Sequence, residues 1–485
     1  PKMNQTNFTL AKEAALFIGR ERELSLLRKR YKSSAFELVG IYGRRRVGKT
    51  SLINEFVRDL PCGYCMAVED DREANLRLLS RAVFSLQDPN AGVDAFAETP
   101  VYPNFESAIE AAFEATRSRR AVLVIDEFPY LAKAYPAFPS ILQSAIDRNK
   151  DSSKLFLILC GSSLSFMKEQ LLDGKSPLYG RRTAQIELKP FDFFEALEFF
   201  PGVDPREAAC VYGMVGGIPL YLRQYSASLS LAENISAMFL DPGSILYEES
   251  SNLIKQEVSK AAPYNAVIAA IAGGAAQHNE IAAKAGMDTS ALDYYLKGLA
   301  RIDLLQRVEP IGGKGGRKAL WHIKDNLFRF WYRFIGPRRA MIERGMGDMA
   351  VPAIEQGLPL FMGPVFETMC RDWLWRECAA GSLDFPMTDV GCWWGNDPKE
   401  RSQAEIDIVA VDGSTTTLVG ECKWRGEPTD VDQLRKLDAR AWLAGAGAQT
   451  PRWLFSKSAY TDACKAFALN LPSSARLVTF EEMVR

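Results

Sequence analysis

The feature that most constrains this chain is a glycine loop between a short apolar run and a helical pattern. Residues 43–50 read GRRRVGKT and fit G-x-x-x-x-G-K-[ST] at every position. The preceding run, 36–42, is apolar and partly β-branched, and residues 51–56 have helical apolar spacing. This order predicts a phosphate-binding loop, because the loop N–H groups and the helix N-terminus both face an anion. The residues assigned to nucleotide binding are Gly43, Arg44, Arg45, Arg46, Val47, Gly48, Lys49, Thr50 and Ser51.

Two side chains of this loop carry the chemistry of a bound nucleotide. Lys49 reaches the outer phosphates of ATP, and Thr50 offers its hydroxyl to Mg²⁺. A P-loop predicts a second, acidic strand, and residues 121–125 form a continuous apolar run followed by Asp126 and Glu127. We expect Asp126 to share the Mg²⁺ ion with Thr50, and Glu127 to deprotonate the attacking water.

A third buried strand, residues 154–160, ends in hydroxyl side chains. Ligands of parallel α/β sheets bind at the carboxyl ends of the strands, so Ser162 is expected to contact the γ-phosphate or its water. A plain turn is the alternative. Arg181 and Arg182 follow, where a phosphate-sensing arginine would act in its own subunit or in a neighbouring copy of a homo-oligomer. Solvated surface arginines explain the pair equally well.

The order of these motifs resembles that of ATPases of the AAA+ and STAND-like kind. Residues 17–24, FIGREREL, look like the segment that lies against adenine in those proteins. Residues 216–222, GGIPLYL, are similar to their helical-lid motif. The resemblance covers roughly residues 17 to 235 and implies Arg20 and Pro219 as neighbours of the adenine.

A middle segment has the pattern of a winged helix. Three short helices are expected, at residues 265–272, 279–286 and 290–300, followed by strands at 304–308 and 319–323. The glycine loop between the strands is basic, and Lys314, Arg317 and Lys318 would grip DNA phosphates. Aspartates on and beside the third helix argue against a basic groove-reading face. A packing module of the ATPase is the alternative.

The last third of the chain carries a second constellation of charged residues. Residues 404–411 alternate in polarity, Asp412-Gly413 signals a turn, and residues 417–424 return as a strand. Glu421 and Lys423 share a face, about 7 Å apart, while Cys422 faces the other way. With a loop of about five residues, Asp407 would lie opposite Glu421, with Cβ atoms about 5 Å apart. Two carboxylates and an ammonium group then converge.

Such a cluster suits Mg²⁺-dependent phosphodiester hydrolysis and resembles the restriction-endonuclease-like PD-(D/E)xK nucleases. The resemblance implies Glu367, Asp407, Glu421 and Lys423 as catalytic, with the three acids as metal ligands. Gln433 on the following helix would orient water. Ile406 replaces the proline of the motif's name. A surface salt bridge is the alternative, but three acids around one lysine repel one another unless a cation arrives.

Composition bounds the remaining possibilities. The chain has 485 residues, 59 Lys and Arg against 60 Asp and Glu, and only two histidines, so a zinc hydrolase or a serine triad has almost no residues to use. Nine scattered cysteines predict reduced thiols and a cytoplasmic protein. No apolar run reaches the ~18 residues of a membrane span.

The expected architecture is an α/β multidomain chain. It consists of a P-loop parallel α/β ATPase domain with a helical lid, a winged-helix domain and a C-terminal restriction-endonuclease-like α/β domain. The expected segments are a tail at 1–16, the ATPase core at 17–190, the lid and linker at 191–260, the winged helix at 261–345 and the nuclease-like domain at 346–485. The predicted function is ATP hydrolysis coupled to a Mg²⁺-dependent nuclease that acts on DNA. The alternative is a nucleotide-dependent switch that binds DNA or a protein without cutting.

Overall fold

The computed structural model describes residues 17–87, 100–258, 260–312 and 319–485. The chain divides into two compact units, and the five finer segments expected from the sequence stay a prediction. The first unit holds residues 1–190 and 218–220, and the second holds residues 191–217 and 221–485. The lid region therefore packs with the C-terminal half of the chain, except for three residues. Lys314, Arg317 and Lys318 lie outside the described residues.

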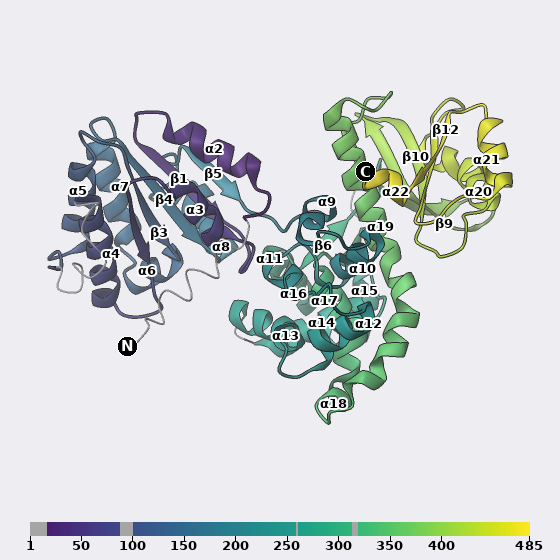
Figure 1. The fold of residues 1–485 in the computed structure, drawn as a ribbon, viewed down its shortest axis with the longest axis horizontal. Coiled ribbons are helices and arrows are strands. Elements are labelled where there is room, and N and C mark those ends of the chain that lie inside the picture. The colour runs from purple at the N-terminus through teal and green to yellow at the C-terminus, as the bar shows by residue number, and fades with distance from the viewer. Residues whose placement is uncertain (1–16, 88–99, 259, 313–318) are drawn as a thin grey trace. The chain divides into compact units, whose positions relative to one another are not determined.

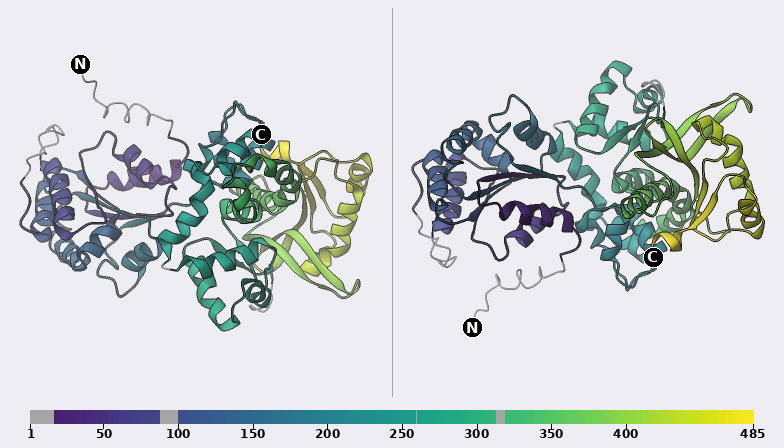
Figure 2. Two further views of the ribbon diagram at one scale, coloured as in Figure 1. Left: turned by 90° about the horizontal axis from the view of Figure 1, so that it is seen from below. Right: turned by 90° about the horizontal axis from the view of Figure 1, so that it is seen from above.

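The first unit is a parallel sheet covered by helices on both faces (Figures 1 and 2). The strand order is β2-β3-β4-β1-β5, and every pairing is parallel. Its strands are β1 (Glu37–Tyr42), β2 (Cys62–Met66), β3 (Ala121–Asp126), β4 (Leu155–Gly161) and β5 (Ala184–Glu187). Its helices are α2 (Glu21–Tyr31), α3 (Lys49–Val57), α4 (Arg72–Gln87), α5 (Phe105–Ala115), α6 (Phe128–Ala134), α7 (Phe138–Asn149) and α8 (Leu164–Leu172).

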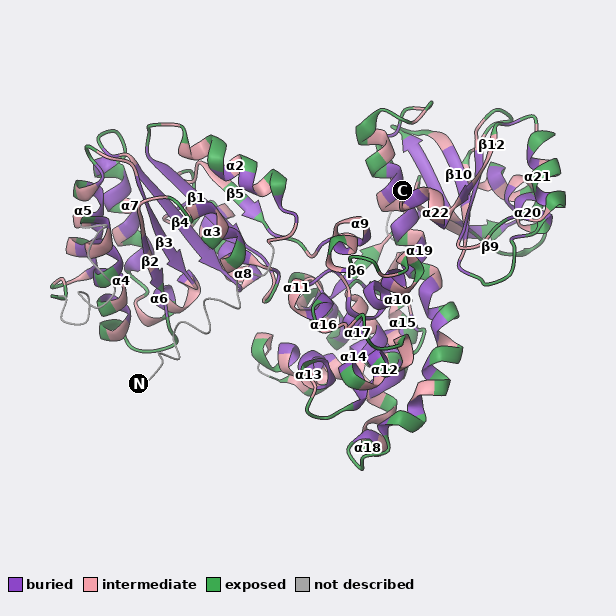
Figure 3. Cartoon of the chain, in the orientation of Figure 1, coloured by how far each residue is buried: buried purple, intermediate pink, exposed green. Residues whose placement is uncertain are grey.

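The apolar composition of the central strands explains their position. Strands β1, β3 and β4 are buried along their whole length (Figure 3), as expected of strands with helices on both faces. Helices α2 and α3 cover one face, while α4 to α7 supply much of the core on the other. Because β4 lies between β1 and β3, the residues after these three strands meet at one edge of the sheet.

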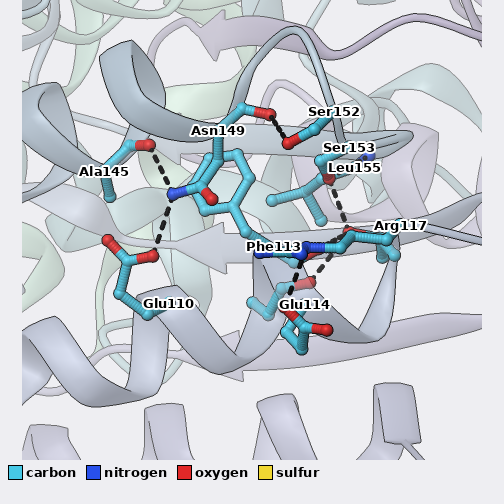
Figure 4. A network of polar contacts seen from close by, with 11 residues as sticks. Glu110, Phe113, Glu114, Arg117, Ala145, Asn149, Ser152, Ser153 and Leu155 are labelled. Carbon is cyan, nitrogen blue, oxygen red and sulfur yellow. Dashed lines mark hydrogen bonds and ion pairs between the residues drawn. The ribbon is translucent and has the colours of Figure 1, made fainter.

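Polar contacts fasten α5 to α7 on the outside of this layer. The Asn149 side chain donates to Glu110 Oε2 at 2.8 Å and to the Ala145 carbonyl at 3.0 Å (Figure 4). Ser152 donates to the Asn149 carbonyl, and Ser153 accepts from the Leu155 N–H at the start of β4. These bonds lie at the amino end of the sheet and leave the carboxyl edge free for the loops of the site.

The second unit begins with short helices and a small hairpin. The helices are α9 (Phe193–Ala196), α10 (Pro205–Val215), α12 (Leu231–Ile235), α13 (Ile245–Glu257), α14 (Ala261–Ala272), α15 (His278–Ala285), α16 (Thr289–Arg301), α17 (Asn326–Phe330) and α18 (Arg339–Ile342). Helix α11 (Pro219–Leu222) starts in the first unit and ends in the second. Strands β6 (Leu305–Val308) and β7 (Leu320–Ile323) pair antiparallel after α16. Three helices and a hairpin thus follow one another where the sequence predicts them.

The C-terminal part of this unit is a mixed sheet beside a long helix, α19 (Val351–Ala380). The strand order is β12-β11-β10-β9-β8, antiparallel from β8 to β10 and parallel from β10 to β12. Its strands are β8 (Asp389–Asp397), β9 (Ser402–Asp412), β10 (Thr415–Lys423), β11 (Arg452–Ser456) and β12 (Ala475–Thr479); its further helices are α20 (Val431–Arg440), α21 (Asp462–Leu469) and α22 (Phe480–Met483). Apolar residues of α20 and α21 share a core with the sheet. Trp373 of α19 packs against Trp453 and Phe455 of β11, with ring centroids 6.2 and 6.0 Å apart.

Two acids face each other where α19 packs on α9. Asp192 caps α9 and accepts from Arg376 Nη2 at 2.9 Å through each of its oxygens. Asp372, one turn before Arg376, has its pKa raised to about 7 by burial and then by the charge of Asp192. The folded protein therefore holds a proton on Asp372 at pH values where the unfolded chain, with a pKa of 3.8, does not.

We expect Asp372→Asn to stabilise the protein more at pH 8 than at pH 5, by about 1–2 kcal/mol. Since the folded pKa is the higher one, the penalty of ionising Asp372 grows as the pH rises and is complete above about 7. The asparagine removes that penalty. Thermal unfolding of both proteins at the two pH values measures the effect, and an equal gain at both would show that Asp372 does not titrate as described.

Candidate functional sites

The P-loop connects β1 to α3 and has the geometry of an anion site. Arg46 and Gly48 take positive φ angles of 67° and 97°, which turn the chain around the loop. Lys49 is buried, and its Nζ donates to the carbonyls of Gly43 and Arg44 at 3.0 Å each. Burial lowers the pKa of Lys49, whereas Cys160, Glu127 and Asp126 act in the opposite direction. The ammonium group thus lies inside the loop, where it could donate hydrogen bonds to a bound phosphate.

The carboxyl end of β3 holds the acid that the sequence predicts. Asp126 is 2 % exposed and accepts three hydrogen bonds. The donors are the Thr50 hydroxyl at 3.1 Å, the Tyr64 hydroxyl at 2.6 Å and the Glu127 N–H at 2.9 Å. The structure thus brings Thr50, at the start of α3, into direct contact with Asp126, at the end of β3; these are the two expected Mg²⁺ contacts.

Glu127 occupies an unusual backbone conformation beside this acid. Its φ of 51° and ψ of 43° are left-handed, which costs a non-glycine residue of the order of 1 kcal/mol. The conformation directs its carboxylate toward the end of β4. There Oε2 accepts from the Ser162 N–H at 3.2 Å and from the Ser162 hydroxyl at 3.0 Å. Ser162 thus orients Glu127, a contact the sequence did not suggest.

Gly43 is required where the P-loop passes the chain after β5. A Cβ at Gly43 would lie 2.3 Å from the Leu188 carbonyl oxygen, a backbone atom. The Leu188 N–H also donates to the Tyr42 carbonyl at 2.7 Å, which fixes this neighbour. The loop and the strand end therefore approach too closely for a side chain.

We expect Gly43→Ala to lower the free energy of unfolding by about 1–3 kcal/mol and to weaken ATP binding. The added methyl group forces the loop away from Leu188 and displaces the amides that face phosphate. Gly174→Ala is the matched control, because nothing lies within 4 Å of its Cβ position. Thermal unfolding and nucleotide titration compare the two, and equal behaviour would contradict the close approach.

The remaining predicted nucleotide residues divide into two groups. Arg20 is 6 % exposed and donates to the carbonyls of Lys189 at 2.7 Å and Val47 at 3.3 Å, so it braces the loop. Pro219 lies beside the loop, with its Cγ 3.8 Å from a Cβ built on Gly48. Arg181 and Arg182 come just before β5, at the amino edge of the sheet, where they bond Asp147 and the Leu171 carbonyl. They do not reach the P-loop of their own chain, and action on a neighbouring copy stays a prediction.

The second constellation forms at the β9–β10 hairpin, although not by the expected loop. The turn has two residues rather than about five, and the first pairs are Thr415 with Asp412 and Thr416 with Val411. This register, if continued, would place Glu421 opposite Ile406. A bulge at Thr417 shifts it, so that Gly420 pairs with Ile408 and Asp407 comes opposite Glu421. Asp407 therefore lies opposite Glu421, as predicted, because of a two-residue turn and a bulge rather than a five-residue loop.

Asp407 itself lies at a second irregularity. On its other side, Gly391 of β8 pairs with Val409 while Trp393 pairs with Ile406, so β9 has an extra residue opposite Cys392. Asp407 Oδ2 accepts from the Cys422 N–H at 2.9 Å. Such bulges re-aim side chains, and this one directs the Asp407 carboxylate at the neighbouring strand.

Lys423 joins the two strand carboxylates. Its Nζ lies 2.5 Å from Glu421 Oε1 and 3.8 Å from Asp407 Oδ2. The three side chains are 16, 21 and 13 % exposed, so they are largely sheltered from solvent. Burial alone would lower the pKa of Lys423, but Glu421 and Asp407 outweigh it and raise that pKa.

Excess negative charge surrounds this lysine. Burial and then the charge of Asp407 raise the pKa of Glu421, of Glu367 on α19 and of Glu405 on β9. Glu367 also lies 3.8 Å from Arg371 Nη1. Four carboxylates thus face two cationic side chains, a balance that a divalent cation would relieve.

The metal prediction needs one correction. Among the described residues, no group of three or more His, Cys, Asp and Glu side chains is close enough together to hold a metal ion. Glu367 pairs with Arg371 instead of joining Asp407 and Glu421 as a third ligand. Gln433 lies on α20, and no hydrogen bond within the described chain joins its side chain to the cluster. Its role stays a prediction.

Comparison with known proteins matches the segment that contains the first site to a family of ATPase domains. Residues 17–225 match the ATPase_2 model, described as an ATPase domain predominantly from Archaea. The chain is 32 % identical over 434 residues to "Uncharacterized protein MJECL04" of Methanocaldococcus jannaschii, covering 89 % of this chain and 93 % of that protein. The chain belongs to the ATPase_2 family. This family segment contains the P-loop, Asp126, Glu127, Ser162, Arg20 and Pro219.

Two further similarities agree with the ATPase_2 assignment. A 44-residue segment is 41 % identical to "Uncharacterized ATP-binding protein MJ0423" of the same organism, over 9 % of this chain and 75 % of that protein. The Walker-type ATPase PABY2304 of Pyrococcus abyssi has the same fold over 65 % of this chain and 96 % of its own, with a TM-score of 0.50 and 19 % identity.

The C-terminal cluster of this ATPase_2 protein lies in a second matched region. Residues 331–437 match DUF234, described as archaeal and bacterial proteins of unknown function. The match spans Glu367, Asp407, Glu421, Lys423 and Gln433. No helix in the described part of the chain is long and apolar enough to cross a membrane.

Sequence reasoning missed four residues at the two sites. Tyr64 on β2 belongs to no sequence motif, yet its hydroxyl donates to Asp126. Burial and then the charge of Asp126 raise the pKa of Cys160, and Cys160 in turn acts to raise the pKa of Lys49. Glu405 and Arg371 belong to the acidic cluster. Glu405 sits two positions before Asp407, and this same-face spacing was a signal available in the sequence.

Proposed function

We propose that this ATPase_2 protein hydrolyses ATP with Mg²⁺ at the P-loop and carries a Mg²⁺-dependent nuclease centre at Asp407, Glu421 and Lys423. The single observation that supports the second part is the approach of both strand carboxylates to one sheltered lysine. A phosphodiester substrate brings oxygens of its own. Mg²⁺ is usually held by one or two carboxylates together with substrate phosphates, so a third protein acid is not required.

At the P-loop, each residue has a defined task. Thr50 and Asp126 would hold Mg²⁺, which neutralises phosphate charge during transfer. Lys49 would exchange its two loop carbonyls for phosphate oxygens. Glu127, oriented by Ser162, would take the proton of the attacking water.

At the second centre, Asp407 and Glu421 would hold the cation. Lys423 would hold the attacking water or the charge that develops on the phosphate. Helices α14 to α16 and the β6–β7 hairpin have the element order of a winged helix, which supports DNA as the substrate. The α16 surface, where Asp293 pairs with His278 at 3.0 Å and Lys297 at 4.0 Å, is not basic.

The experiment that tests the proposal incubates the purified chain with Mg²⁺ or with EDTA and a panel of substrates. The panel comprises duplex, single-stranded and supercoiled DNA and an RNA, each with and without ATP. Cutting that depends on Mg²⁺ is the expected result. If no substrate is cut in any nucleotide state, the second candidate stands, a nucleotide-dependent switch that binds without cutting. The absence of a three-acid group among the described residues favours that candidate.

A further inference from the structure

A group of basic side chains adjoins the carboxylate cluster through Arg371, which contacts Asp407 and Glu367. Arg371 comes from α19, Arg329 from α17 and His322 from β7. Burial, then Arg329 and Arg371, lower the pKa of His322, so the three side chains lie within electrostatic range of one another. Three elements separated in sequence thus bring two arginines and a histidine together.

Arg329 is held in place but not satisfied. Its guanidinium lies over the Phe361 ring, 4.5 Å from the centroid, and Nη2 donates to the Phe361 carbonyl at 3.5 Å. Its Nε is buried and donates to no acceptor in the described chain. A buried donor without an acceptor costs about 1–3 kcal/mol, so its retention points to a ligand.

Arg371 links this basic group to the acidic cluster. Its Nη1 donates to the Asp407 carbonyl at 3.2 Å and lies 3.8 Å from Glu367 Oε2. Glu367 also acts on the charge of Arg329. The basic and acidic groups are therefore neighbours, with Glu367 between them.

Backbone contacts fix the β6–β7 hairpin region against the same sheet. The Ile311 N–H donates to the Cys392 carbonyl at 2.9 Å. Cys392 is the residue of β8 that lies opposite Asp407 and Ile408, where β9 has its extra residue. A Cβ on Gly391 would lie 2.8 Å from Ile311, which confirms close packing. The hairpin is thus attached beside the cluster rather than free of it.

We infer that Arg329 and Arg371, flanked by His322, form a subsite for a backbone phosphate of a nucleic acid next to the phosphate that is cut. Guanidinium groups suit this ligand because their planar donors match phosphate oxygens. The hairpin and α17 thereby become part of the substrate site of the C-terminal domain. This inference rests on the proposed nuclease function for its substrate class.

The test measures binding separately from cutting. Wild type, Arg329→Gln and Arg371→Gln, each carrying Asp407→Asn to prevent cutting, are titrated with labelled duplex DNA, single-stranded DNA and RNA across a range of salt concentrations. Each arginine variant is expected to weaken binding about tenfold and to reduce the salt slope by about one phosphate contact. Arg344→Gln is the matched control, since Arg344 is exposed and lies before α19, whose first residue, Val351, is separated from Arg371 by about 30 Å of helix.

The pKa of His322 provides a second test, which needs no substitution. The chain has two histidines, so ring signals of the labelled protein are readily assigned. A phosphate between the two arginines would offset their charge, so the pKa of His322 is expected to rise when nucleic acid is added. The signals of His278, on α15, are expected to stay unchanged.

Unaltered affinity and salt slope in the folded arginine variants would overturn the subsite. A His322 pKa that stays unchanged when nucleic acid is added would also overturn it. Failure to bind any of the three nucleic acids would overturn it as well. Binding through these arginines without cutting by the chain that retains Asp407 would reject the nuclease and retain the subsite. If substitution of either arginine changes neither cutting nor binding, the subsite is rejected and the nuclease is retained. If Arg329→Gln fails to fold, Arg329→Lys keeps the charge and is expected to show a smaller loss.

Discussion

Replacing Glu127 with Gln is expected to lower ATP turnover by about 10²- to 10⁴-fold, the usual contribution of a general base. The amide keeps an oxygen that can accept from Ser162, so the strained backbone and the neighbouring Asp126 should remain in place. ATP binding should therefore persist. Single-turnover hydrolysis and nucleotide titration separate the two effects.

Lys49→Ala provides the contrast to this variant. Removing the ammonium group deletes both bonds to the loop carbonyls and the charge that phosphate would meet, so binding itself should be lost. Lys150→Ala is the control, because that lysine is exposed at the end of α7. Unchanged turnover in Glu127→Gln would move the base to another residue.

Asp407→Asn is expected to abolish Mg²⁺-dependent cutting, with a loss of at least about 10²-fold. The asparagine still offers an oxygen to the Cys422 N–H, so the bulged strand should keep its shape while the charge that holds the cation is gone. Cutting rates on the preferred substrate of the panel give the measurement.

Two comparisons make the Asp407 result specific. Asp412→Asn changes an exposed acid at the end of the same strand and should cut normally. ATP turnover of Asp407→Asn should equal that of wild type, because the cluster belongs to the other unit. Normal cutting by Asp407→Asn would remove the cluster from the reaction.

The P-loop site was predictable because its residues are close in sequence or at strand ends. Residues 43–50 form one continuous motif. Asp126 ends a buried strand, and the apolar run 121–125 predicts the position of that strand. The exposure and backbone angles of Glu127 and the contact with Tyr64 depend on tertiary packing, which no local pattern encodes.

At the second cluster, the sequence predicts which face each side chain occupies but not the register of the strands. Alternation placed Glu421 and Lys423 on one face and Cys422 on the other, and Cys422 indeed meets Cys370 of α19. Bulges at Thr417 and opposite Cys392 decide the register, and neither has a sequence signal as clear as a glycine turn. The ion pair of Glu367 with Arg371 also replaced an expected ligand, because arginine one helical turn away competes for that acid.

Counting bound Mn²⁺ tests most directly whether the chain has two separate cation centres. We predict that nucleotide-free protein mixed with single-stranded DNA binds one Mn²⁺ at millimolar concentration beyond the ions that this DNA binds alone, as measured by electron paramagnetic resonance, and that ATP adds a second. Asp407→Asn should lose only the first ion and Thr50→Ala only the second. Absence of this first Mn²⁺ from the protein with DNA, or its binding by Asp407→Asn as by wild type, would contradict the account.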